Sequence, residues 1–144
     1  MKSKKKISLN AGNYFENGYH CAEAVVAAVL EGMGMEATGA VSHATAFGGG
    51  MGRTFREVCG ALSGCLIVIG HIHGRHEPDV SWDIPAQLAA NIRQKFIDRF
   101  ETTCCQELRN RFGLEKQQQE CCNIVKILSS DLVDLLKEPN MIKQ

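Results

Sequence analysis

The chain has 144 residues, equal numbers of basic and acidic side chains (16 of each), and seven cysteines. A chain of this length buries roughly 68% of the surface that its unfolded form exposes, so one domain can form a hydrophobic core without disulfides. Zero net charge excludes a global field that would attract nucleic acid, and an odd number of cysteines cannot all pair within one chain. We therefore expect the cysteines to serve chemistry.

The N-terminus is basic but lacks the features of a targeting segment. The lysines at residues 4–6 are followed by polar residues and glycine, not by the apolar core of a signal peptide. The longest apolar run, residues 65–69, is far shorter than the roughly 20 residues that span a bilayer. We expect a cytoplasmic protein without membrane insertion, formed by one domain over residues 1–144 with a flexible basic tail over residues 1–8.

Apolar residues recur at helical spacing along most of the chain, and no segment alternates convincingly as a strand does. The expected helices cover residues 19–31, 58–69, 88–100, a segment that ends at 112, and 122–135. A strand is the competing prediction for residues 66–69, but the helical pattern around them is longer. The sequence predicts an all-α fold, a compact bundle of about five helices with a C-terminal helix hairpin.

The predicted hairpin turns at Gly113. A glycine after a helix permits the left-handed cap, and Leu114 behind it can make the apolar contact that closes such a cap. Cys105 lies eight residues before the turn and Cys122 nine residues after it. At about 1.5 Å of rise per residue, both are carried roughly 12 to 14 Å from the turn, so the hairpin brings them level.

Each arm of the hairpin carries a pair of adjacent cysteines, Cys104 with Cys105 and Cys121 with Cys122. Adjacent helical residues point about 100° apart, so only one member of each pair should face the opposite arm. We predict that Cys105 and Cys122 do so, because each heads an apolar stripe and the other two fall outside the stripes. The alternative is that these are ordinary small residues of the core, since free cysteine is often buried.

The spacing of the cysteines limits the kinds of redox or metal site that they can form. No Cys-x-x-Cys occurs, which excludes a thioredoxin-like pair, and without Cys-x-x-Cys-His there is no c-type haem attachment. Thiolates suit iron with sulfide, or zinc. Helix N-termini near Cys21, Cys59 and Cys122 are expected to lower the pKa of these thiols.

Two further segments are candidates for ligand binding. His71, His73 and His76 could bind a metal, or could simply interact with a helix C-terminus. The glycine loop of residues 48–53 could hold an anion with its N–H groups and Arg53, but it lacks the Lys-Ser/Thr ending of a phosphate loop. We favour a loop that lets the backbone pass close to a cluster or to a neighbouring helix.

Residues 59–64 read Cys-Gly-Ala-Leu-Ser-Gly. This signature, together with residues 19–25, 47–53, 105–108 and 122–125, resembles a family of redox-active proteins known for four cysteines and written C_GCAxxG_C_C. The resemblance implies that four of the cysteines are functional and that the other three are particular to this sequence. The implied functional residues are Cys21, Cys59, Cys105 and Cys122, and the other three are Cys65, Cys104 and Cys121.

A domain of this kind is also similar to the N-terminal part of split-Soret cytochromes, which carry an iron-sulfur centre as well as haems; the haem-binding part has no counterpart here. The resemblance implies an iron-sulfur cluster of unspecified type on the four implied cysteines, and electron transfer to or from an unidentified redox partner. Two alternatives remain open. One is a thiol-disulfide protein without metal, with Cys105 and Cys122 as its pair, and the other is a non-catalytic helical interaction module such as a homodimer.

Overall fold

The computed structural model describes residues 1–138, and every regular element in this range is helical. The elements are α1 (Lys4–Glu16), α2 (Cys21–Gly32), α3 (Thr38–Ala44), the 3-10 helix η1 (Thr45–Phe47), α4 (Gly60–His73), α5 (Asp83–Phe100), α6 (Cys105–Phe112) and α7 (Gln117–Lys137). The predicted all-α class is confirmed. The expected count of about five helices is too low, because α1 and the short α3 were not predicted.

Helix α1 occupies most of the segment that was expected to be a flexible tail. The Ser3 hydroxyl accepts a hydrogen bond from the Lys6 N–H at 3.1 Å, which caps the helix. Ile7 and Ala11 are completely buried, whereas the lysines between residues 4 and 6 stay exposed. The buried face of α1 consists of few and mostly small residues, so its apolar stripe is too sparse to stand out in the sequence.

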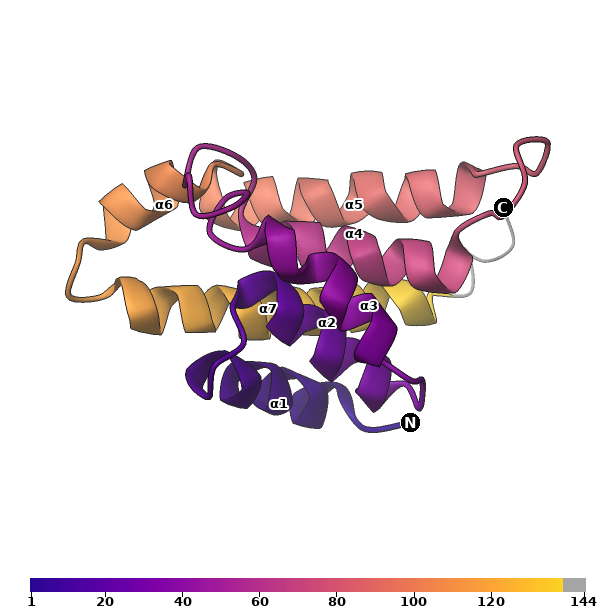
Figure 1. The fold of residues 1–144 in the computed structure, drawn as a ribbon, viewed down its shortest axis with the longest axis horizontal. Coiled ribbons are helices and arrows are strands. Elements are labelled where there is room, and N and C mark those ends of the chain that lie inside the picture. Colours follow the sequence, from indigo (N-terminus) through magenta and orange to yellow (C-terminus); the bar gives the residue numbers. More distant parts are fainter. Residues whose placement is uncertain (139–144) are drawn as a thin grey trace.

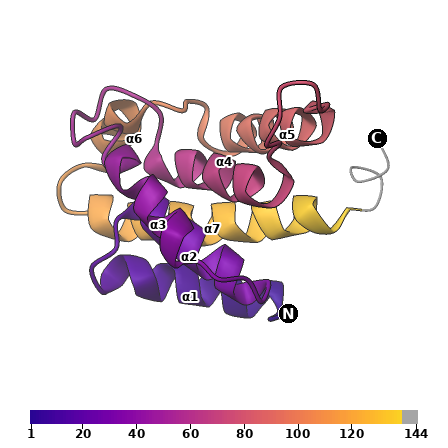
Figure 2. The ribbon, with the colours of Figure 1, turned by 45° about the vertical axis from the view of Figure 1, so that its right-hand side comes forward.

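Helix α2 is the centre of the bundle. Nine of its twelve residues are buried, as expected for a helix that is apolar on all sides. It contacts α1 and α7 on one side and α3 and α4 on the other. Figure 2 shows α1, α7 and α4 stacked from bottom to top, with α2 and α3 in front of them, and Figure 1 shows α5 running along the outer side of α4. Among the described helices, none combines the length and the hydropathy needed to cross a bilayer.

Helix α4 packs against α2 without room for side chains at Gly60 and Gly64. A Cβ atom added at Gly64 would lie 2.7 Å from the Ala22 carbonyl oxygen, and one added at Gly60 would lie 2.4 Å from the Cys21 Sγ. These glycines thus permit close contact between the two helices, and the competing strand at residues 66–69 is wrong. The close approach also places the start of α2 directly beside the start of α4.

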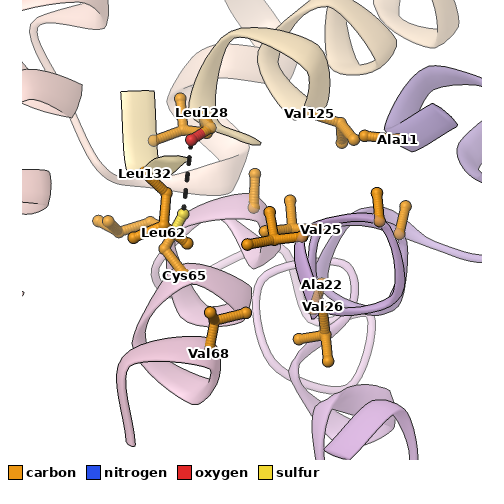
Figure 3. Packing of buried hydrophobic residues seen from close by; sticks show 14 of the residues in the cluster. Ala11, Ala22, Val25, Val26, Leu62, Cys65, Val68, Val125, Leu128 and Leu132 are labelled. Atoms are coloured by element: carbon orange, nitrogen blue, oxygen red, sulfur yellow. Dashed lines mark hydrogen bonds between the residues drawn. The ribbon is translucent and has the colours of Figure 1, made fainter. Parts of the chain in front are cut away.

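Cys65 belongs to the core between α4 and α7. Its thiol is completely buried, and its Sγ lies 4.0 Å from the carbonyl oxygen of Leu128, as the dashed line in Figure 3 shows. Nearby on α7, Asp131 is buried and forms a bidentate ion pair with Arg99, at 2.7 and 2.8 Å. Burial, and to a lesser extent the charge of Asp131, raise the pKa of the Cys65 thiol. Here cysteine acts as a small apolar core residue.

This buried thiol makes stability depend on pH. The unfolded thiol ionises near pH 9.0, whereas the folded one keeps its proton to higher pH. The folded chain therefore binds more protons, and stability that is complete below pH 9.0 falls above it by up to about 1.4 kcal/mol per pH unit for each such thiol. Urea unfolding of the reduced protein between about pH 7.5 and 10 should show a steeper decline for the wild type than for Cys65→Ala. Equal slopes would contradict the assignment.

Candidate functional site

Four cysteines from four helices line one cavity of about 590 Å³. Cys21 is the first residue of α2, Cys59 is the N-cap of α4, and Cys105 is the first residue of α6. The fourth, Cys121, lies near the start of α7. Cys59 is 8% exposed, and the other three are partly exposed. We call this cavity the cysteine pocket.

Backbone pairing fixes the positions of Cys59 and Cys105 relative to each other. The Cys59 N–H donates to the Thr103 carbonyl at 2.7 Å, and the Cys105 N–H donates to the Glu57 carbonyl at 2.9 Å. An isolated antiparallel bridge lies between these two bonds. The segment before α4 and the segment before α6 thus run side by side, and each delivers a cysteine to the pocket as its helix begins.

Cys21 is positioned by the cap of α2. The Nδ1 atom of His20 accepts from the Glu23 N–H at 3.4 Å, and the Glu23 carboxylate accepts from the His20 N–H at 3.2 Å, which together form a capping box. The His20 Nε2 lies 2.7 Å from the Thr45 carbonyl oxygen, so Nε2 carries the proton. The hydrogen bond to the Cys21 thiol is the main cause that raises the pKa of His20. Sequence reasoning did not place the His20 ring in the pocket lining.

The hairpin brings Cys121, and not Cys122, to the pocket. The Cys122 Sγ points to α1, where it lies 3.8 Å from the Gly12 carbonyl oxygen and 3.5 Å from the Glu16 carboxylate. The apolar stripe headed by Cys122 was expected to face α6, but it is buried in the core, where α7 contacts α1, α2 and α4. Cys121 lies about 100° around the helix from that stripe and therefore faces α6 and the pocket.

The turn of the hairpin differs from the predicted cap. Gly113 has φ +79° and ψ 161°, which is not the left-handed helical conformation, although only glycine adopts it readily. Leu114 was expected to close the cap, but it is 88% exposed. The chain nevertheless reverses after α6, as Figure 1 shows at the left of the molecule. Cys104 lies outside the pocket lining, with its Sγ 3.7 Å from the Arg56 carbonyl oxygen.

Three of the pocket thiols have raised pKa values. Burial is the main cause that raises the pKa of Cys59, of Cys105 and of Cys121, the last to about 11. The nearby Cys21 raises all three further, and Arg109 lowers the pKa of Cys105 and Cys121 to a smaller extent. The helix N-termini near Cys59 and Cys122 were expected to lower the pKa of these two thiols, but burial raises both.

The glycine loop packs tightly against the pocket. Residues 49–53 all have φ between +61° and +71°, and Phe55 has φ +62°. This left-handed conformation costs roughly 1–2 kcal/mol for each residue that carries a side chain, such as Arg53. A Cβ atom added at Gly50 would lie 2.7 Å from the Cys105 Cβ. The expected close approach of the backbone to a neighbouring helix is confirmed.

The three candidate histidines do not form a group like that of the four pocket cysteines. Across residues 1–138, no three side chains of histidine, cysteine, aspartate or glutamate converge closely enough to hold a single metal ion. His71 and His73 lie in the last turn of α4, and His76 follows in the loop toward α5. The four cysteines surround a cavity instead of meeting at one point.

Comparisons with known proteins give the family. No curated protein and no solved structure matches the chain at a significant level. The family described as "Putative redox-active protein (C_GCAxxG_C_C)" matches residues 19–133, a range that contains all four pocket cysteines. The match covers most of the chain, and we conclude that the chain belongs to the C_GCAxxG_C_C family of redox-active proteins.

Proposed function

We propose that the chain is an electron-transfer protein that binds an iron-sulfur cluster in the cysteine pocket. The ligands would be Cys21, Cys59, Cys105 and Cys121. The observation that carries the proposal is that these four thiols, which come from four different helices, line one cavity. Four thiolates are the usual ligand set of a cluster. A cluster also spreads its ligands over several irons, so the sulfurs need to surround a space and not a point.

The electrostatics of the pocket support this proposal. A cluster with four thiolate ligands is an anion, and the N-termini of α2, α4 and α6 all begin at pocket cysteines, where the helix dipoles favour negative charge. Arg109 adds a positive charge that acts on Cys105 and Cys121. Ligation by iron would also explain why buried thiols with raised pKa values are gathered here, because a metal displaces the thiol proton.

The same observations weigh against thiol-disulfide chemistry. A nucleophilic cysteine needs a lowered pKa, whereas burial raises the pKa of Cys59, Cys105 and Cys121. The pair considered for a disulfide also lies apart, with Cys105 in the pocket and Cys122 against α1.

The test is to purify the full chain without oxygen and to measure iron and acid-labile sulfide per chain. We expect both in comparable amounts, with visible absorption that bleaches on reduction by dithionite and returns on reoxidation. The number of thiols that react with a thiol reagent should rise by four after the iron is removed. Colourless, iron-free protein in which all the pocket thiols react at once would refute the proposal.

A further inference from the structure

The charged side chains of the cysteine pocket all have one sign. Arg53 and Arg109 line it, and its lining contains no aspartate or glutamate, although the chain as a whole has as many acidic as basic residues. Within residues 1–138, neither guanidinium forms an ion pair or donates a side-chain hydrogen bond. Two guanidinium groups therefore reach the pocket with their donors free.

The structure holds Arg109 in place by stacking. Its Cζ lies 4.0 Å from the centre of the Phe55 ring, a cation–π contact. Arg109 lies on α6 one turn after Cys105, so its charge is carried by the same helix that carries a pocket thiol. The contact restrains the guanidinium and leaves its N–H donors to a ligand.

The structure holds Arg53 by a strained turn. Its N–H donates to the Gly48 carbonyl at 3.1 Å, and a Cβ atom at Gly49 would lie 3.0 Å from the Arg53 Cα, so the turn leaves no spare room. Arg53 and Phe55 both adopt φ near +61° at an energetic cost. Strain of this kind persists mainly at functional sites, and here it places Arg53 at the pocket and the Phe55 ring under Arg109.

The remaining lining indicates the class of ligand. The cavity of about 590 Å³ lies within the range of roughly 300–1,000 Å³ that small-molecule sites occupy. Phe15, Ala46 and glycines give apolar surface, and Gln117 and Gln118 give amide groups. A guanidinium binds a carboxylate through two parallel hydrogen bonds. A small organic carboxylate fits these features, with its charge on the arginines and its body against the apolar wall.

We propose that Arg53 and Arg109 form a carboxylate-binding subsite of the cysteine pocket, so that a small organic carboxylate binds beside the thiols. The pocket would then be a substrate site and not only a holder for a redox group. The proposal rests on the charges and shape of the pocket, and it stands whether or not the thiols bind a cluster.

The test uses two reagents that differ in charge. Iodoacetate and iodoacetamide both alkylate a thiolate: sulfur attacks the methylene carbon, the S–C bond forms, and iodide leaves. Only iodoacetate carries a carboxylate. The readout is the ratio of the two alkylation rates at Cys21, measured by mass spectrometry on the full chain after metal and reductant have been removed. The thiolate fraction affects both rates equally, so the ratio reports the attraction of the carboxylate alone.

We expect the iodoacetate-to-iodoacetamide ratio to fall about fivefold in Arg53→Gln and in Arg109→Gln, the effect of one nearby charge in a hydrated pocket. Arg56→Gln is the matched control, because Arg56 lies in the same loop but outside the pocket lining. Arg109→Lys keeps the charge and should keep most of the ratio, which separates charge from folding. In denaturant, where the pocket is absent, all variants should give the same iodoacetate-to-iodoacetamide ratio.

An unchanged ratio in both glutamine variants, or an equal fall in Arg56→Gln, would overturn the carboxylate subsite. The measurement needs no iron, so its failure leaves the iron-sulfur proposal standing. In the same way, iron-free protein would refute the cluster without affecting the alkylation ratio.

Discussion

Cys121→Ala is expected to remove the visible absorption and most of the iron from protein purified without oxygen, whereas Cys122→Ala is expected to keep both. The two changes are chemically identical and lie next to each other on α7. Only Cys121 lines the cysteine pocket, while Cys122 is 4% exposed and packs against α1. Loss of one of four thiolate ligands leaves an iron site open, so we expect the cluster to be lost or to become labile to oxygen.

Analysis of iron and sulfide, together with absorption spectra, shows which of the two cysteines is needed to hold the cluster. Cys122→Ala also serves as a control for stability, because it leaves a small cavity in the core and should lower the free energy of unfolding by an amount on the order of 1 kcal/mol. Retention of iron in Cys121→Ala together with its loss in Cys122→Ala would mean that the apolar stripe, and not the pocket, identifies the fourth ligand.

The choice between Cys121 and Cys122 shows how much of the site could be predicted from the sequence. The hairpin around Gly113 correctly places one arm beside the other, and Cys105 lies in the pocket as that geometry expects. The apolar stripe of α7 marks the face of the helix that enters the core. It was taken for the face that meets α6, but the core covers it, and α1, which Cys122 contacts, was not predicted. A correct helical periodicity therefore selected Cys122, whereas Cys121 lines the pocket.

Other features depend on contacts that a single sequence does not show. The glycine run predicted a close approach of the backbone, but not that Arg53 and Phe55 share its left-handed conformation. The helix N-termini at the cysteines could be predicted in part, yet their effect on thiol pKa could not. Burial acts in the opposite direction, and its extent is known only once the helices are packed.

The packing that brings Cys21 to the pocket can be tested with two glycines of α4, the buried Gly64 and the exposed Gly70. Gly64→Ala is expected to lower the free energy of unfolding by about 1–3 kcal/mol, because the added Cβ would lie 2.7 Å from a backbone oxygen of α2 and the two helices must separate. Gly70→Ala meets nothing within 4 Å and should raise it by up to about 1 kcal/mol through better helix propensity.

Chemical denaturation measures the free energy of unfolding of both variants. Because both replace glycine by alanine in α4, their difference reports the position of the glycine and not a general effect of alanine. Since α2 carries Cys21 at its first residue, a shift of α2 away from α4 also displaces one proposed ligand. We therefore expect Gly64→Ala to hold less iron than Gly70→Ala when both are purified without oxygen. Equal stability of the two variants would show that α2 and α4 do not pack closely enough for the glycine to matter, and the position of Cys21 beside Cys59 would then need another cause.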